Sequence, residues 1–371
     1  MKTRTAIVRQ LPGEYEVAEL DLEEAGTGEI TVKMVSAGLC HSDDHLATGD
    51  MPMASLPFAG GHEGAGVVVA IGAGVKGIAE GDHVVFSFVP ACGHCRWCAS
   101  GMQNLCDLGA NLLLGSRFDD PTSFRLHLDG QPVGQMAGLS TFSEYTTVDV
   151  NSAIKMPKDV PLEPLCLLGC GVGTGWGSSV YSANVQINDT VIIMGVGGIG
   201  INAVQGAAHA GASHVIAVDP VPFKRELAEK LGATETFPDI EAAGEFARRV
   251  TNGQGADAAI VTVGVTTGEH VAQAFSTIRK AGTCVVTGIG NFAEMATNIP
   301  LMDLALSQKR IQGSLYGQCN PARDIPRQLE LYRAGTLKLD ELITARYTLD
   351  EVAQGYRDLH AGKNIRGIIT F

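Results

Sequence analysis

Residues 190–200 read Thr-Val-Ile-Ile-Met-Gly-Val-Gly-Gly-Ile-Gly, in which an apolar run is followed by the pattern Gly-x-Gly-x-x-Gly. The apolar run predicts a buried strand, and the segment after Gly200 predicts a helix. Gly195 allows a tight turn, Gly197 lets a phosphate approach the backbone, and Gly200 permits close packing of helix and strand. Because a helix N-terminus attracts anions, this stretch predicts a site for the pyrophosphate of a dinucleotide.

The acidic residue Asp219 lies at the end of the next predicted strand, residues 214–218. Its carboxylate can accept hydrogen bonds from both hydroxyls of a ribose and would repel a 2′-phosphate, which favours NAD over NADP. Lys224 is close enough in sequence to reach an adenosine hydroxyl, and Gly198 and Ile199 complete the glycine turn. The alternative is an ordinary turn, followed by a solvated aspartate and a surface lysine.

The sequence pattern divides the chain into two domains of an α/β protein. Alternating strands and helices predict a doubly wound parallel sheet, a Rossmann-type cofactor domain, over residues 172–315. Residues 1–171 consist of short β-rich segments separated by glycine and proline, which predicts small barrels or rolls. Residues 316–371 contain two amphipathic helices and a terminal strand that can return to the first domain. Residues 107–138 show little periodicity, which is typical of a functional or mobile loop.

Four cysteines lie close together in the sequence, with two-residue gaps between the first three. A thiolate binds zinc at about 2.3 Å in a tetrahedron, and this spacing lets three cysteines surround one ion while the fourth returns from a short loop. A closed shell of four sulfurs leaves no position for a substrate, so the predicted zinc is structural. The alternative is a set of disulfides or unpaired thiols. This zinc lobe spans residues 92–106, and its ligands are Cys92, Cys95, Cys98 and Cys106.

A second set of candidate ligands is dispersed along the chain. Cys40, His62 and Cys170 each lie near glycines. Two sulfurs and one imidazole leave a fourth zinc position open for water or substrate. Taken alone, however, a buried cysteine is more often a small core residue, and a lone histidine is more often a hydrogen-bonded polar residue. The spacing leaves both interpretations open.

The composition limits the partners. The 371 residues carry a net charge of −13, which would repel nucleic acids and anionic membrane surfaces. We find no apolar signal core at the N-terminus and no long apolar run, so we expect a cytoplasmic protein without a membrane partner. The nine cysteines cannot all pair with one another, which fits a reducing compartment.

The motifs occur in the order found in the zinc-dependent medium-chain alcohol dehydrogenases, and the chain resembles that family over essentially its whole length. The resemblance implies a GroES-like β-rich catalytic domain, a Rossmann domain, two zinc ions per chain, and NAD. Within the family, the chain is most similar to the class III-like branch and to the actinobacterial NDMA-dependent enzymes, which need an artificial nitroso acceptor and keep their NAD bound. The shared motifs are Cys40-His-Ser-Asp, Gly61-His-Glu-Gly-Ala-Gly, the zinc lobe, Gly169-Cys-Gly-Val-Gly-Thr-Gly and Gly195-Val-Gly-Gly-Ile-Gly.

The resemblance implies that Cys40, His62 and Cys170 are the ligands of a catalytic zinc. It places Glu63 close behind the metal and implies that Asp43 holds the ring of His62. Such outer contacts fix the tautomer and the orientation of a histidine ligand. Without the resemblance, Glu63 would be a buried partner of a cation and Asp43 a helix cap.

The resemblance also implies a proton relay and further cofactor contacts. Ser42 matches the hydroxyl next to the substrate alcohol, and His45 matches the outer end of the proton relay. Arg366 matches a residue that contacts the cofactor phosphates, and Thr174 matches one that packs beside the nicotinamide. His41 stands where many relatives carry a phosphate-binding arginine, so phosphate binding is expected to depend on pH.

The implied reaction is a reversible hydride transfer between a primary alcohol and NAD, which gives an aldehyde. Zinc lowers the pKa of bound water from about 15.7 to about 7, and it should favour loss of an alcohol proton in the same way. If the NAD does not exchange, an external redox acceptor must reoxidise it. Family members are commonly dimers or tetramers, so we expect a homo-oligomer.

Two alternatives follow from the same motifs. The first is a glutathione-dependent formaldehyde dehydrogenase, whose branch has an acidic residue two places after the glycine that is Gly49 here. Met51 stands at that position, and Asp50 is one place early. The second is a catalytically silent relative that keeps the fold and the structural zinc. Zinc-free quinone reductases share the fold but lack the zinc lobe.

Overall fold

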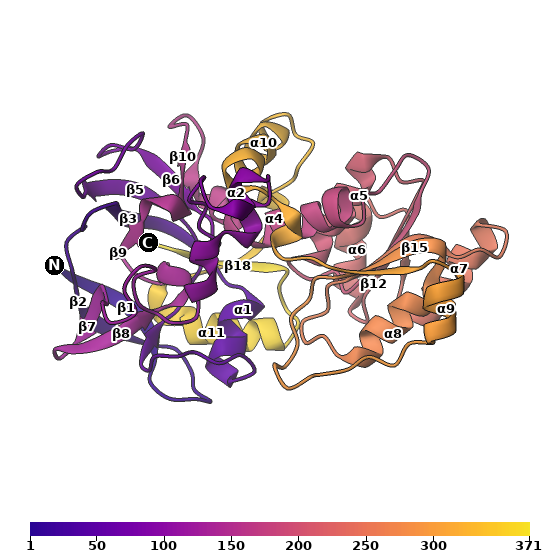
Figure 1. Cartoon of the computed structure of the whole chain (residues 1–371), viewed down its shortest axis with the longest axis horizontal. Coiled ribbons are helices and arrows are strands. Elements are labelled where there is room, and N and C mark those ends of the chain that lie inside the picture. The colour runs from indigo at the N-terminus through magenta and orange to yellow at the C-terminus, as the bar shows by residue number, and fades with distance from the viewer. The chain divides into compact units, whose positions relative to one another are not determined.

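The chain folds into two compact units, described by a computed structural model of residues 1–371 (Figure 1). The first unit comprises residues Met1–Cys170 and Asn320–Phe371, and the second comprises Gly171–Cys319. The boundaries expected from the sequence lie within four residues of these positions. None of the helices combines the length and the hydropathy that a bilayer-spanning segment requires.

The first unit contains a closed barrel and a seven-stranded sheet. The C-terminal strand β18 pairs antiparallel with β3, with Ile368 opposite Gly38, so the end of the chain completes the first unit. The barrel strands, in spatial order, are β1 (Lys2–Val8), β2 (Glu16–Leu22), β7 (Leu126–Leu128), β8 (Gln131–Gln135) and β4 (Phe58–Ala59). The sheet strands are β10 (Ala153–Met156), β6 (His83–Phe86), β5 (Glu63–Ile71), β3 (Glu29–Gly38), β18 (Arg366–Thr370) and β17 (Ile343–Tyr347), with β9 (Tyr145–Asp149) paired to β3.

The helices of the first unit are short, apart from α10 (Pro321–Arg333). Helix α1 begins after Cys40 and ends at Gly49, whose φ of 85° is a left-handed conformation that glycine adopts without strain. The helices are α1 (His41–Thr48), α2 (Arg96–Ala99), α3 (Leu162–Leu165), α10 (Pro321–Arg333) and α11 (Val352–His360).

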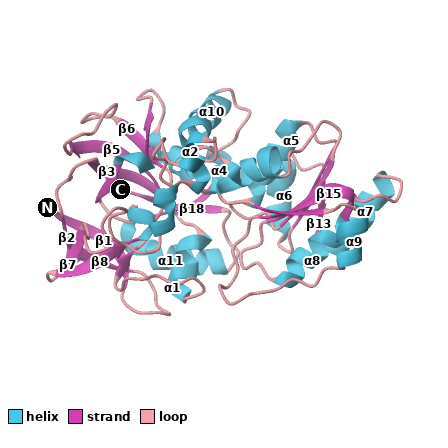
Figure 2. Cartoon of the chain, in the orientation of Figure 1, coloured by secondary structure: helices cyan, strands magenta, loops and turns pink.

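The second unit is a six-stranded parallel sheet with helices packed against it (Figure 2). The strand order reverses between β11 and β14, and ligands of such sheets bind at the carboxyl ends of the strands beside this switch. The strands are β13 (Glu235–Phe237), β12 (His214–Val218), β11 (Thr190–Met194), β14 (Ala256–Val261), β15 (Ile278–Val286) and β16 (Arg310–Gly313). The helices are α4 (Gly171–Gly177), α5 (Gly200–Ala210), α6 (Pro222–Lys230), α7 (Ile240–Val250), α8 (Gly268–Thr277) and α9 (Leu301–Leu306).

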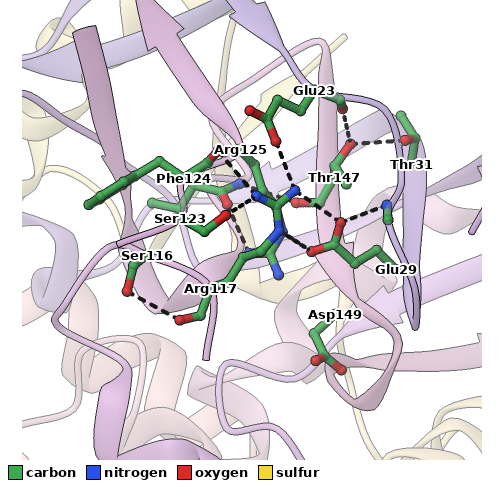
Figure 3. A network of polar contacts seen from close by, with 12 residues as sticks. Glu23, Glu29, Thr31, Ser116, Arg117, Ser123, Phe124, Arg125, Thr147 and Asp149 are labelled. Carbon is green, nitrogen blue, oxygen red and sulfur yellow. Dashed lines mark hydrogen bonds and ion pairs between the residues drawn. The ribbon is translucent and has the colours of Figure 1, made fainter. Parts of the chain in front are cut away.

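Residues 107–138, whose lack of periodicity predicts a functional or mobile loop, contain regular secondary structure. They contain two short 3₁₀ segments and strands β7 and β8, which are part of the barrel. The strands have three and five residues, too few to give a periodic signal. This segment is also anchored to the first unit through Arg117 and Arg125 (Figure 3).

Glu29, at the start of β3, is the acceptor for both arginines. The Nε atoms of Arg117 and Arg125 donate to its Oε1 at 2.8 and 2.7 Å, and the Gly26 amide donates to Oε2 at 2.8 Å. Arg125 is only 2% exposed and also donates to Gln135 at 3.1 Å. Burial opposes ionisation of Glu29, but the hydrogen bond from Arg117 and the charge of Arg125 outweigh it and hold the pKa of Glu29 below its ordinary value.

We expect Glu29→Gln to lower the free energy of unfolding by about 3 kcal/mol at neutral pH, because it removes the carboxylate that is paired with buried Arg125. Since the folded-state pKa of Glu29 is depressed, its stabilising effect is present above the unfolded value of about 4.3 and is lost as pH falls through the folded value. Urea unfolding of both proteins at several pH values measures this difference. The control is Glu16→Gln, whose partner Arg9 is half-exposed, with an expected loss of at most about 1 kcal/mol. Equal losses for the two variants would contradict the argument.

Candidate active site

Four buried side chains of the first unit form a compact group of possible metal ligands. The ligand atoms of Cys40, His62, Glu63 and Cys170 all lie within 4.8 Å of one another. Cys40 immediately precedes α1, His62 immediately precedes β5, Glu63 is the first residue of β5, and Cys170 ends the first segment of the unit. The fold therefore brings together the three dispersed ligands expected from the sequence.

His62 is oriented by Asp43. Its Nδ1 lies 2.9 Å from Asp43 Oδ2, although the angle departs from hydrogen-bond geometry, and Asp43 Oδ1 accepts a 2.8 Å hydrogen bond from the Gly61 amide. The His62 side chain is 1% exposed, and its Nε2 has no hydrogen-bond partner. Burying a polar nitrogen without a partner is costly. Two sulfurs and one unsatisfied imidazole nitrogen are a donor set that suits zinc.

The thiols and the imidazole influence one another strongly. A hydrogen bond from Cys170 holds the pKa of Cys40 well below that of an ordinary thiol, and the same contact raises the pKa of Cys170. Burial is the largest single influence on His62 and opposes its protonation, but the charge and hydrogen bonding of Asp43 and Cys40 together raise the pKa of His62 well above its usual value. A bound divalent cation would replace these protons and satisfy the sulfurs and the nitrogen directly.

Glu63 forms a buried ion pair with Arg366, the first residue of β18. Arg366 Nη2 also donates to the Leu39 carbonyl at 3.3 Å, and both charged side chains are almost fully buried. Burial is the largest influence on Glu63 and raises its pKa despite the guanidinium. The guanidinium of Arg366, for which a phosphate contact is expected, is therefore paired with Glu63 beside the candidate metal ligands.

The four cysteines of the zinc lobe also come together, and none of them forms a disulfide. The sulfurs of Cys92 and Cys98 are 3.9 Å apart, and those of Cys95 and Cys106 are 4.0 Å apart. In a tetrahedron with zinc–sulfur bonds of about 2.3 Å, neighbouring sulfurs are about 3.8 Å apart. Backbone amides of Cys92 and Cys95 point at sulfurs at 3.4 and 3.3 Å. The lobe thus fits one tetrahedral zinc, and the disulfide alternative is wrong.

In the second unit, the glycine turn lies between β11 and α5, as the sequence predicted. Gly195 has a φ of 89°, and a side chain at Gly200 would overlap the Gly195 carbonyl and Thr262. A Cβ at Gly197 would meet no atom within 4 Å, so the turn is open beside this residue. These features fit a backbone cradle for an anion.

Asp219 is buried at the end of β12 and faces the glycine turn. Its Oδ2 accepts a hydrogen bond from the Val196 amide at 3.1 Å, and its Oδ1 accepts one from the Val221 amide at 2.9 Å. Lys224 lies in the first turn of α6. Arg225 donates to the Asp219 carbonyl at 2.6 Å. This residue could not be predicted from the sequence, because it follows Lys224 and belongs to no motif.

Helix α1 carries the residues for which a proton relay is expected. Ser42 Oγ lies 3.8 Å from Cys40 Sγ, and the ring of His41 lies 6.3 Å from that of His45. His45 is 1% exposed, and its Nδ1 lies 3.2 Å from Asp50 Oδ2. Thr174 is in α4 and is buried.

Comparison with known proteins identifies the family. Residues 26–158 match the family model described as alcohol dehydrogenase GroES-like domain, and residues 198–333 match the one described as zinc-binding dehydrogenase. The NDMA-dependent alcohol dehydrogenase of Amycolatopsis methanolica is 49% identical over 369 residues, with 100% of this chain and 99% of that protein covered. The chain belongs to the zinc-dependent medium-chain alcohol dehydrogenase family.

Solved structures agree with this membership. An alcohol dehydrogenase zinc-binding domain protein from Burkholderia ambifaria superimposes with a TM-score of 0.92 at 32% identity, and it covers 100% of this chain and 99% of its own. Benzyl alcohol dehydrogenase from Acinetobacter calcoaceticus gives a TM-score of 0.88 at 30% identity, with the same coverage. The expected GroES-like and Rossmann fold classes are confirmed, and the chain is an oxidoreductase of the alcohol dehydrogenase type.

Proposed function

We propose that this alcohol dehydrogenase converts primary alcohols to aldehydes, with NAD as hydride acceptor and two zinc ions per chain. The observation that carries the proposal is the buried group of Cys40, His62 and Cys170, in which His62 Nε2 has no hydrogen-bond partner. A silent relative would have no need to bury an unsatisfied imidazole beside two thiols. The lobe of Cys92, Cys95, Cys98 and Cys106 would hold the second, structural zinc.

The open zinc would lower the pKa of the substrate hydroxyl. The side chains around this zinc site would have different roles. Asp43 would fix the ring of His62 so that its Nε2 can hold the metal, and the pairing of Glu63 with Arg366 balances a buried charge beside the ligands. Ser42, close to Cys40, would orient the substrate hydroxyl and begin the proton relay, and His45 would stand at its outer end.

The second unit would bind the nucleotide and hold its pyrophosphate at the glycine turn, which comprises Gly195, Gly197, Gly198, Ile199 and Gly200. His41 and Arg366 are proposed as further phosphate contacts, Lys224 as an adenosine contact, and Thr174 as a nicotinamide contact. Asp219 selects NAD, since a carboxylate beside the glycine turn repels a 2′-phosphate.

Replacing Asp219 by asparagine is expected to weaken NAD binding about tenfold and to reverse part of the discrimination against NADP, because the side chain loses its charge but keeps an oxygen for the Val196 amide. Titration of the purified protein, freed of nucleotide, with each cofactor measures both affinities. The control is Asp239→Asn, at the N-terminus of α7, which should leave both affinities unchanged. An unchanged NAD-to-NADP ratio in the Asp219 variant would refute the role of this carboxylate.

We also propose that the NAD stays bound between turnovers and that an external acceptor reoxidises it. The support is the 49% identity to an enzyme named NDMA-dependent. Acid release of nucleotide from exhaustively gel-filtered protein tests this proposal. About one NAD(H) per chain would support it, whereas a value near zero would indicate an ordinary dehydrogenase that exchanges free NAD.

The glutathione-dependent alternative receives no support from the site. Asp50, the carboxylate nearest to the expected glutathione-branch position, accepts a hydrogen bond from Thr48 and contacts His45. Met51, which occupies the position of the acidic residue in the glutathione-dependent branch, is uncharged.

We further propose a homo-oligomer in which two copies meet at strand β16. All four residues of this edge strand are exposed, and apolar side chains of α9 nearby, Leu301 and Leu306, are 73% and 75% exposed. Exposed edges and apolar side chains are usually covered in stable proteins. Light scattering at micromolar concentration should give a multiple of the chain mass, and the mass of one chain would contradict the proposal.

A further inference from the structure

Asp50 lies against His45 at the end of helix α1, where the proposed function requires a proton acceptor. We propose that Asp50 is a positioning residue for proton transfer, which fixes the tautomer of His45 and stabilises its protonated ring. This inference rests on the proposed function, in which His45 accepts the proton from the substrate alcohol. It assigns to Asp50 a role in proton transfer that neither the sequence motifs nor the comparisons give it.

The local backbone explains why Asp50 reaches back onto the helix. Gly49 adopts a φ of 85°, and the amide of Met51 donates to the carbonyl of His45 at 3.0 Å. This left-handed helix end turns the chain back over its own last turn. The side chain of residue 50 therefore approaches the side chain of residue 45, which lies on the preceding helical turn.

The contacts place the carboxylate between the buried ring and the solvent. Asp50 Oδ2 lies 3.2 Å from His45 Nδ1 and accepts a 3.1 Å hydrogen bond from Thr48 Oγ1. The side chain of His45 is 2% exposed, whereas that of Asp50 is 28% exposed. A carboxylate within hydrogen-bond distance of one ring nitrogen favours the tautomer that carries its proton on that nitrogen.

The other carboxylates of α1 face different partners. Asp43 contacts His62, and Asp44 Oδ2 lies 2.8 Å from His360 Nε2 of helix α11. The ring of His41, on the same helix, is 6.3 Å from that of His45 and is the neighbouring group that could repel a protonated ring. Of these three carboxylates, Asp50 is the one that contacts His45.

The proton balance is simple. With its Nδ1 proton directed at Asp50, neutral His45 keeps Nε2 as the ring nitrogen that takes up the proton arriving from the alcohol through the proposed relay. The resulting imidazolium is stabilised by the Asp50 carboxylate, which itself stays ionised. Nε2 then gives the proton to water, and the ring returns to the neutral form with its proton on Nδ1.

The first test compares alcohol oxidation by the zinc-loaded, NAD-loaded wild type and Asp50→Asn across pH. We expect kcat to fall about tenfold to a hundredfold near neutral pH with little change in KM, and to recover in part when free imidazole is added as a substitute base. The matched control is Asp44→Asn, which removes a carboxylate–histidine contact from the same helix but should change kcat less than about twofold.

A second readout does not depend on activity. Nitrogen NMR of histidine-labelled protein, with His45 assigned through a His45→Gln variant, should show the ring protonated on Nδ1 in the wild type and a loss of this preference in Asp50→Asn. If the wild type oxidises no alcohol, the proposed function fails, while the NMR result still decides the pairing. The inference is overturned by an unchanged tautomer in Asp50→Asn, by wild-type kcat in that variant, or by a loss of kcat that imidazole does not restore.

Discussion

Replacing Cys170 by serine is expected to lower kcat for alcohol oxidation by at least about a thousandfold, which is about 4 kcal/mol of transition-state stabilisation. The reason is that Cys40 and Cys170 supply the two sulfurs of the proposed zinc site. The variant retains only one thiolate and one imidazole. Zinc content should fall from about two ions per chain to about one, since the zinc lobe has its own four sulfurs. Steady-state kinetics and elemental analysis of the same samples measure both quantities.

Cys166→Ser provides a matched control for this variant. Cys166 is buried four residues before Cys170 and lies outside the ligand group, and its sulfur contacts the Glu163 carbonyl at 3.2 Å, an acceptor that a serine hydroxyl can use. This variant should keep two zinc ions and its activity. Activity within tenfold of the wild type in Cys170→Ser, or loss of both zinc ions, would refute the assignment of the open site.

The second large effect is expected from Cys106→Ser in the zinc lobe. Structural zinc sites in small peptides contribute about 10–16 kcal/mol of apparent binding free energy, so a lost ligand should release the metal and unfold the lobe. We expect one zinc per chain and a clearly lower Tm, because few apolar side chains hold residues 92–106 in place. Elemental analysis and thermal unfolding measure these changes.

His94 offers the control within the same lobe. Its side chain is exposed, and its Nδ1 contacts the Cys92 carbonyl at 2.9 Å rather than a candidate metal position. His94→Gln should therefore keep both zinc ions and the wild-type Tm. If Cys106→Ser also kept two zinc ions, the four-sulfur site would be wrong.

Features with a local cause could be predicted from the sequence. The glycine turn after β11 follows from the backbone needs of Gly195 and Gly200, and the zinc lobe follows from cysteines separated by two residues. The open zinc site could not be predicted from local sequence, because Cys40 and Cys170 are 130 positions apart and no local pattern joins them. For that site, resemblance to a family supplied what spacing left open.

Long-range polar contacts accounted for most of what the sequence did not reveal. Glu63 meets Arg366 only because the C-terminal strand returns to pair with β3, and Glu29 meets Arg117 across 88 positions. The contact of Asp50 with His45 is short in sequence, yet it depends on the left-handed conformation of Gly49. Composition and periodicity contain no information about such pairings.

The most direct test of the central claim is a single turnover. The purified protein, loaded with zinc and NAD, would be mixed with excess primary alcohol, such as benzyl alcohol, without an added acceptor, and the absorbance of reduced nicotinamide would be followed. We expect about one reduced nicotinamide per active chain in the wild type and none in Cys170→Ser. No reduction in the wild type across a panel of primary alcohols, with both zinc sites filled, would contradict it.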